Sequence, residues 1–557
     1  MQDRLWGGWD PYMPAASVSA QLSVKKMQAA ILLGLCLLMP RVLSSLTTST
    51  ITIKSGHLEG QPANDAGIKA FLGIPYAAPP VGNLRWSAPQ PAPASSAVRS
   101  ATAFGASCYS AAPAYPQDGP VSEDCLFANV WTGALCATEA RPVMVWFHGG
   151  GFQFGSSSVP LYNGGKLAEH GVIVVTINYR LGVFGFLGLE ELDRQGTPSG
   201  NYGLQDQLAA LLWVRENIGA FGGDPENVTV FGQSAGAHSI GILLASPFST
   251  GLFHKAILES GAYWDSEHGS LRTFAGARAQ GAAFAKQLGA SSVMQLRTLT
   301  AESINNAGSW NASTDPGLTA FAPSIDGYVV PTFPAEIFDV GKSQKVPLLA
   351  GFNAAEGVAF LPRIVPHVPT AGYARSSKTL FGPMTPAFLS LYPGDTQAQA
   401  NVSALDLLGD LVIREQTFET IDRQANINRQ DVYAYYYTYT SAYSPIAVHT
   451  AEIYYVFGNL GPDPLLGPTG TPTVADVDFS MTISAYWTNF AKTGNPYSAS
   501  ASLPFWPKYS MPSDDFLELG NNVTVIPNPF RDRFQFLSSL RMNGELPPSW
   551  RHDFTDN

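Results

Sequence analysis

The chain has 557 residues, of which 45% are hydrophobic and 13% are charged, which is enough apolar material for a full-sized core. Its 53 glycines and 42 prolines predict many tight turns and long surface loops. The net charge of −11, with no Lys/Arg cluster beyond Lys25 and Lys26, argues against nucleic acid or an anionic membrane as a partner.

An apolar run at residues 29–39 follows Lys25 and Lys26. It is too short for the roughly 20 residues of a membrane span and is typical of a signal peptide. We therefore expect residues 1–46 to be a signal peptide region, cleaved between 42 and 48, with Met27 as an alternative start; a buried core helix is the competing interpretation. No other apolar run approaches spanning length, so we expect an extracellular protein without a membrane anchor.

Cysteine usage agrees with export. If Cys36 leaves with the signal peptide, Cys108, Cys125 and Cys136 remain, and the 17-residue separation of the first two fits a short-loop disulfide that leaves Cys136 over. The sequence has no C-x-x-C pair and no His/Cys cluster, so we expect no metal.

Four sequons with the pattern N-x-[ST] predict glycosylation sites. Asn311 and Asn401 are expected to lie in polar, loop-like surroundings. Asn227 directly precedes an apolar strand and is a poorer candidate, and Asn522 is the fourth.

The first elements of the chain differ in type. A short strand is expected at residues 51–54, and the proline-rich stretch 73–80 is expected to form turn-rich surface. Continuous apolar runs at 143–147 and 172–178 are typical of parallel strands buried on both faces. Residues 202–218 have helical periodicity.

Residues 228–241 predict a strand, a sharp turn and a helix, with Ser234 at the turn. Gly232 and Gly236 bracket the serine, because a Cβ at either place would collide with a neighbouring strand or helix. This is the pattern of a nucleophile elbow, which exposes the serine Oγ above the sheet edge. A G-x-S-x-G match alone is weak evidence, since a chain this long contains one by chance roughly one time in five.

The remaining elements continue the alternation of strands and helices. We expect strands at 255–260, 346–351 and 432–439, a helical and loop region at 265–320, an insertion at 365–425 and a helix at 478–492. This order predicts an α/β protein whose mostly parallel sheet is flanked by helices, with the inserted regions belonging to a single domain spanning residues 47–557.

A glycine-rich motif, His148-Gly-Gly-Gly151, follows the first apolar run and precedes Ser234 by 86 residues. Acyl transfer needs backbone N–H groups aimed at the developing oxyanion, and glycines let the backbone approach a substrate closely. The candidate donors are the N–H groups of Gly150, Gly151 and Ala235. A flexible loop is the alternative.

Together these motifs resemble those of type-B carboxylesterases, the cholinesterase-like branch of the α/β-hydrolases. The resemblance covers residues 50 to 540 and departs at Gln233, where many members carry glutamate. It implies an α/β-hydrolase fold and a secreted, fungal-type serine esterase. The matching motifs are, in order, residues 123–126, 148–152, 178–181, 203–207, Trp213, 221–225 and 231–236.

The resemblance also implies a catalytic triad. His449 stands in the family's His-x-x-Glu pattern, and Glu356 stands in a Gly-x-Asn-x-x-Glu-Gly pattern. The implied mechanism is hydrolysis of carboxylic esters through an acyl-enzyme on Ser234, without a cofactor. The alternatives are a helix-capping surface histidine at 449 and a solvated loop acid at 356. His238, one helical turn after Ser234, is not expected to be the base.

The segment between Cys108 and Cys125 bears on the substrate. It contains no tryptophan to bind a quaternary ammonium and is too short and proline-rich to swing as a lid. We therefore expect action on soluble, uncharged esters, with Trp264 as a candidate for the substrate pocket. A lipase is the alternative, and a catalytically inert adhesion protein is a remote one.

Overall fold

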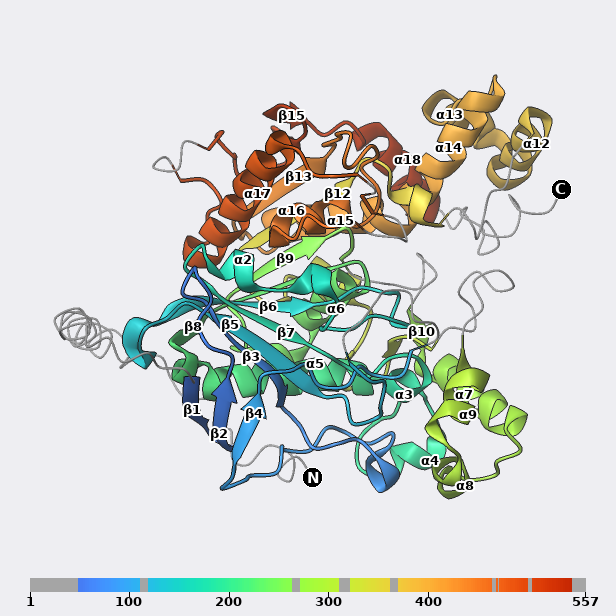
Figure 1. Ribbon diagram of the computed structural model, residues 1–557. Coiled ribbons are helices and arrows are strands. Elements are labelled where there is room, and N and C mark those ends of the chain that lie inside the picture. Colours follow the sequence, from blue (N-terminus) through green and yellow to red (C-terminus); the bar gives the residue numbers. More distant parts are fainter. Residues whose placement is uncertain are drawn as a thin grey trace.

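The computed structural model describes residues 49–110, 119–262, 271–309, 321–360, 369–462, 467–468, 470–498 and 503–542. A ten-stranded sheet forms its centre (Figure 1). The strands are parallel from β14 to β7, and antiparallel pairs close both edges. In spatial order they are β15 (Val523–Pro527), β14 (Asp515–Leu519), β13 (Val432–Tyr437), β12 (Leu348–Asn353), β9 (Lys255–Glu259), β8 (Gly223–Gln233), β6 (Arg141–Phe147), β7 (Ile173–Ile177), β5 (Phe127–Thr132) and β3 (Lys69–Pro75).

Helices cover both faces of this sheet, as predicted (Figure 1). Alternate side chains of β6 enter opposite cores: Val145 packs with α5 (Tyr202–Asn217) and α6 (Ala235–Ala245), whereas Trp146 packs with α16 (Ala451–Phe457) and α17 (Val474–Thr493). Burial on two faces explains why the parallel strands read as unbroken apolar runs. The expected α/β-hydrolase architecture is confirmed.

The two inserted regions are mainly helical. The first contains α7 (Phe274–Gln287), α8 (Val293–Thr298) and α9 (Ala301–Gly308). The second contains α12 (Thr370–Phe381), α13 (Thr385–Leu391) and α14 (Gln397–Gly409), which project from the sheet with a core of their own (Figure 1). From α14 the chain passes through a π-helical turn, η8 (Asp410–Arg414), into α15 (Glu415–Asn426), and the C-terminal α18 (Arg531–Met542) packs alongside.

Smaller elements complete the described chain. They include a three-stranded sheet of β1 (Ser49–Ile53), β2 (Gly56–Gly60) and β4 (Val98–Ala101), the pair β10 (Arg272–Thr273) and β11 (Ser324–Ile325), and the short helices α2 (Gly165–Ala168), α3 (Gly182–Phe186), α4 (Glu190–Asp193) and α10 (Pro334–Asp339). None of the helices in the described chain is long and apolar enough to cross a membrane.

The prediction of turn-rich surface at residues 73–80 is wrong for its first part. Gly73 and Ile74 belong to β3, and Ile74 is fully buried. The strand is irregular here because its register with β5 shifts between Phe71 and Ile74, where Gly73 has a φ of +66°. Tyr76 is also buried, and its hydroxyl donates to the carbonyl of Asn178 over 2.6 Å.

Candidate active site

Ser234 lies at the turn between β8 and α6. Its φ of 54° and ψ of −123° place it in strained backbone, and it is half-buried between the buried Gln233 and Ala235. A Cβ on Gly236 would lie 1.9 Å from the carbonyl oxygen of Phe147, and one on Gly232 would lie 2.7 Å from the same atom. The chain therefore packs glycine backbone directly against β6, as the elbow motif predicts.

The glycine motif follows β6 and turns tightly beside the serine. The carbonyl of Gly150 accepts hydrogen bonds from the N–H groups of Gln153, over 2.9 Å, and Phe154, over 3.1 Å. Gly150 has a φ of +114°, and a Cβ there would lie 2.0 Å from a carbonyl oxygen. A Cβ on Gly149 would lie 3.1 Å from the Cβ of Ser234. The loop and the nucleophile are thus immediate neighbours.

The three candidate oxyanion donors are near this junction. Gly151 is exposed, and a Cβ built on it would meet no atom within 4 Å, so the backbone there borders open space. Ala235 is the first residue of α6, where the helix itself does not use the N–H group.

His148 supports the loop from inside the protein. Burial lowers its pKa to about 4, so the ring is neutral at physiological pH. Its Nδ1 lies 2.8 Å from the carbonyl oxygen of Gly149, and its ring stacks on Tyr179, with centroids 4.5 Å apart. The Tyr179 hydroxyl in turn donates to the carbonyl of His148 over 2.8 Å.

Glu356 and His449 meet across 93 residues of sequence. The His449 Nδ1 lies 2.5 Å from Glu356 Oε2, and the other carboxylate oxygen accepts from the N–H of Asn353 over 2.6 Å. Burial would raise the pKa of Glu356, but the charge and hydrogen bond of His449, with the Asn353 N–H, lower it below the usual value. Both residues are buried, which excludes a solvated loop acid and a surface histidine.

The other ring nitrogen of His449 faces the elbow. The amide nitrogen of Gln233 lies 2.9 Å from His449 Nε2. Because Nδ1 donates to Glu356, Nε2 carries the lone pair and can accept from this amide. The imidazole is thereby linked to the residue that precedes Ser234 in the chain.

His238 is placed differently. It lies one turn into α6, and its Nδ1 is 2.8 Å from the carbonyl oxygen of Ser234. This ring nitrogen thus bonds the helix backbone, as expected for a residue four positions after the nucleophile.

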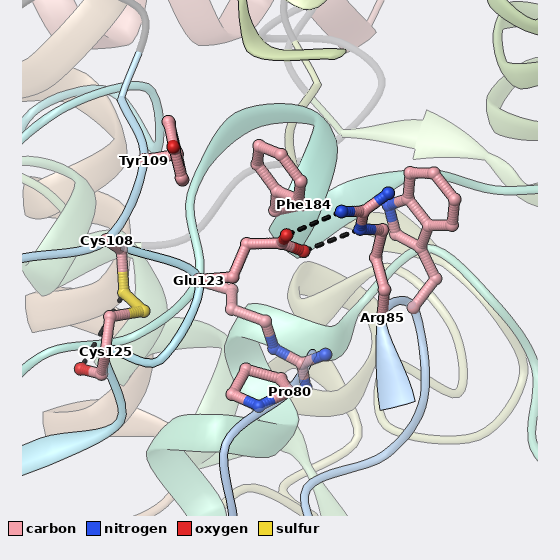
Figure 2. Close-up of a pocket in the computed structure, with 9 residues that line it drawn as sticks. Pro80, Arg85, Cys108, Tyr109, Glu123, Cys125 and Phe184 are labelled. Carbon is pink, nitrogen blue, oxygen red and sulfur yellow. Dashed lines mark hydrogen bonds and ion pairs between the residues drawn. A yellow bond between two sulfur atoms is a disulfide. The ribbon is translucent and has the colours of Figure 1, made fainter. Parts of the chain in front are cut away.

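The loop between Cys108 and Cys125 is fixed at both described ends. The two cysteines form a disulfide. The third cysteine, Cys136, lies outside this loop, and its Sγ is 3.2 Å from Thr138 Oγ1. Glu123 accepts two hydrogen bonds of 2.6 Å from the Arg85 guanidinium (Figure 2). Residues 111–118 of this loop lie outside the described residues.

Two predicted residues also lie outside the described residues: Asn311 of the sequons, and Trp264, the candidate for the substrate pocket. Asn401 lies on α14 rather than in a loop, where its Oδ1 accepts from Gln397 over 2.9 Å. The Asn227 side chain contacts Lys255 within the fold, whereas Asn522 is exposed between β14 and β15.

Asn353 and Glu452 lie within the two motifs that indicate Glu356 and His449, and no role was predicted for either. Asn353 Nδ2 donates to the carbonyl of Val448, over 2.7 Å, and to the Glu452 carboxylate. Burial, together with the nearby Glu356 charge, raises the pKa of Glu452 to about 7. Glu259 is also buried, accepts from Trp487 Nε1 over 2.8 Å, and has a pKa raised by burial and by Glu452. Asn353 and Glu259 end the apolar strands β12 and β9, which is a signal that the sequence offers, whereas Glu452 lies in the first turn of α16.

The model of the carboxylesterase family matches residues 47–537. The chain belongs to the carboxylesterase family. It is similar to the para-nitrobenzyl esterase of Bacillus subtilis (strain 168), with 36% identity over 88% of this chain and 99% of the relative. It is also similar to the fumonisin B1 esterase of Sphingopyxis macrogoltabida, with 36% identity over 82% of this chain and 84% of the relative.

Similarity to a cholinesterase and to a solved structure agrees with this assignment. The cholinesterase of Mus musculus is 32% identical over 90% of both chains. A solved structure of a PNB esterase superposes with a TM-score of 0.74 at 36% identity and covers 88% of this chain. The protein is therefore a carboxylic-ester hydrolase of the α/β-hydrolase fold. The described residues bring together no group of three or more His, Cys, Asp or Glu side chains suited to a metal ion.

Proposed function

We propose that this carboxylesterase hydrolyses esters through a covalent acyl-enzyme on Ser234, with His449 as general base and Glu356 as the acid that orients it. The observation that carries this proposal is the placement of His449 between a carboxylate, 2.5 Å from Nδ1, and the elbow, where Gln233 is 2.9 Å from Nε2. A carboxylate on Nδ1 fixes the tautomer in which Nε2 accepts a proton.

In the first half-reaction His449 Nε2 takes the proton of Ser234 while Oγ bonds to the ester carbonyl carbon. The carbonyl oxygen becomes negative, and the N–H groups of Gly150, Gly151 and Ala235 are the donors that would stabilise it. The C–O bond to the alcohol then breaks, and the alcohol leaves with the proton from His449. In the second half-reaction His449 Nε2 takes a proton from water while the water oxygen bonds to the acyl carbon. The bond from this carbon to Ser234 Oγ then breaks, the serine regains the proton from His449, and the acid leaves.

We further propose that the substrates are soluble, uncharged esters. The residue before the nucleophile is a neutral glutamine, so no carboxylate stands at this position to attract a cation. The disulfide and the Arg85–Glu123 pair hold the described ends of the 108–125 loop, which favours an open site over a swinging lid. The rate should rise hyperbolically with a short-chain ester, without a jump at its solubility limit. A clear jump there would instead indicate a lipase.

The assignment of the base is tested by comparing two histidines. We expect His449→Ala to abolish acyl transfer to Ser234, whereas His238→Ala retains about a tenth of the wild-type rate or more, because its ring bonds the backbone. The measurement is the initial rate of hydrolysis of a p-nitrophenyl ester by folded, purified variants. The opposite ranking would refute the assignment.

A further inference from the structure

Arg414 is buried beside the turn that leads to Glu356. Only 1% of it is exposed, and it lies in η8, the π-helical turn between α14 and α15. A buried guanidinium is costly unless acceptors and a countercharge surround it. The positions of its acceptors therefore show which part of the fold it holds.

Arg414 directs its fork at two successive peptide carbonyls. Nε donates to the carbonyl of Asn353 over 3.3 Å, and Nη2 donates to the carbonyl of Ala354. The third nitrogen, Nη1, donates to Asp410 Oδ1 over 2.7 Å. A planar guanidinium can serve two neighbouring acceptors and a carboxylate at once, which the single ammonium of lysine cannot do in the same geometry.

The same two peptides are held on their opposite edges. The N–H of Ala354 donates to the carbonyl of Tyr437, and the N–H of Ala355 donates to the carbonyl of Ala447, each over 2.9 Å. The peptide units 353–354 and 354–355 thus lie between the β13 side of the sheet and Arg414. Asn353 connects this turn to Glu356, to which its N–H donates, and to Val448, the residue before His449, to whose carbonyl its side chain donates.

Backbone packing also ties the turn to α14, the helix that leads into η8 and Arg414. A Cβ on Gly357 would lie 2.0 Å from the carbonyl oxygen of Leu405, and one on Gly409 would lie 3.1 Å from the Cβ of Glu356. No side chain separates α14 from the turn at these points. A change in the position of the helix would consequently move the carboxylate.

The charge of Arg414 is balanced by Asp410 and Asp406 of the same continuous helical segment, and Asp410 has further partners. Asp410 also accepts from Arg533 of α18, over 2.6 Å, and from the hydroxyl of Tyr392, over 2.7 Å. Burial would lower the pKa of Arg414, but Asp410 and Asp406 raise it above its usual value. The guanidinium is therefore a permanent cation with a fixed partner.

From these contacts we propose that Arg414 is a positioning residue for Glu356: it holds the 353–356 turn so that the carboxylate meets His449 Nδ1 in the geometry needed for proton transfer. The inference rests on the proposed roles of Glu356 and His449. It assigns Arg414 an effect on turnover in addition to its effect on folding.

The matched control is Arg541 of α18. It is buried like Arg414 and pairs with Glu415 of α15, the residue that follows Arg414, and this ion pair joins α18 to α15. Arg414→Lys and Arg541→Lys both keep the positive charge and lose the fork. Loss of thermal stability is expected in both variants, so stability alone does not separate a positioning role from a structural one.

Steady-state kinetics separate the two. We expect Arg414→Lys to lower kcat by about tenfold or more with KM changed by less than about twofold, and to move the acid limb of kcat/KM to lower pH, because a displaced carboxylate stabilises the imidazolium less. Arg541→Lys should leave kcat and the pH profile within about twofold of wild type. Equal losses of kcat in both variants, or wild-type kcat and pH profile in Arg414→Lys, would overturn the proposal.

The Glu356→Gln background distinguishes this inference from the triad itself. If Arg414 acts through Glu356, Arg414→Lys should lower kcat by less than about twofold once Glu356 is already glutamine. Full additivity would contradict the inference. Wild-type turnover by Glu356→Gln alone would instead refute the triad, whereas an impaired Glu356→Gln together with a fully active Arg414→Lys would refute only the role of Arg414.

Discussion

Gln233 places a neutral amide 2.9 Å from the proton-accepting nitrogen of His449. Glutamate at this position would put a negative charge beside the imidazole, where it stabilises the protonated ring. We predict that Gln233→Glu moves the acid limb of kcat/KM upward by about one pH unit. A pH–rate profile on an uncharged ester measures this shift, and an unchanged profile would show that the amide does not contact the base in solution.

The same variant tests the substrate class. Wild type should hydrolyse the choline ester of butyric acid no better than its uncharged 3,3-dimethylbutyl isostere, and Gln233→Glu should raise this ratio. A strong wild-type preference for the choline ester would overturn the proposal of uncharged substrates while leaving the triad intact.

Glu452 gives the protein a pH-dependent stability. Burial and the Glu356 charge raise its pKa from 4.5 to about 7, so the folded state binds this proton more tightly than the unfolded state does. The stabilisation from this bound proton is full at a pH below the pKa that Glu452 has in the unfolded chain, and it is lost as the pH rises through about 7. The free energy of unfolding of wild type should therefore fall between pH 5 and pH 8. We predict that in Glu452→Gln this fall is smaller by on the order of 2 kcal/mol.

Denaturant unfolding at the two pH values measures that change. The exposed Asp65, replaced by asparagine, is the control, and this variant should retain the wild-type pH dependence. A Glu452→Gln variant whose stability falls as steeply as that of wild type between the two pH values would contradict the assignment to Glu452.

Among the elements, the elbow depends on two backbones in direct contact. A methyl group on Gly236 would lie 1.9 Å from the Phe147 carbonyl oxygen, so β6 and α6 would have to separate. We predict that Gly236→Ala lowers the free energy of unfolding by about 3 kcal/mol or prevents folding. Gly219→Ala is the control, since a Cβ there meets nothing within 4 Å; equal melting temperatures for the two variants would be inconsistent with this packing.

The parallel strands were predictable because burial on both faces requires unbroken apolar runs, as in β6 and β7. The edge strands were less visible. β3 contains Gly73 at an irregularity, β14 mixes buried with half-buried residues, and β15 at the sheet margin has no buried residue. A margin of this kind lacks a strong local pattern, so β14 and β15 were not predicted. β5 and α18 were not predicted either.

The candidate site was likewise predictable only where the sequence has a local pattern. Motif resemblance indicated Ser234, Glu356 and His449 because each lies in a short, ordered pattern. The contacts of Arg414 were not predictable, because they join residues about 60 positions apart through backbone carbonyls, which leave no mark on the sequence. Its only local sign is an aspartate four residues earlier in the same buried helical segment.

For the whole molecule, the proposal of secretion rests on residues 29–39 and on the cysteines. The Cys108–Cys125 disulfide is of the kind that persists in oxidising compartments. Expression of the full chain in a secreting host should yield an extracellular protein whose first residue falls between 43 and 49. Retention of an intact N-terminus inside the cell would count against export.

The central claim is that catalysis passes through an acyl group on Ser234. The most direct test is to quench the enzyme with acid during turnover of p-nitrophenyl acetate and to map the acetylated peptide by mass spectrometry. The account predicts a single acetyl group on Ser234. It predicts no adduct in Ser234→Ala, which should fold normally and lose about three or more orders of magnitude in kcat. Acetylation at another residue, or full turnover by Ser234→Ala, would contradict it.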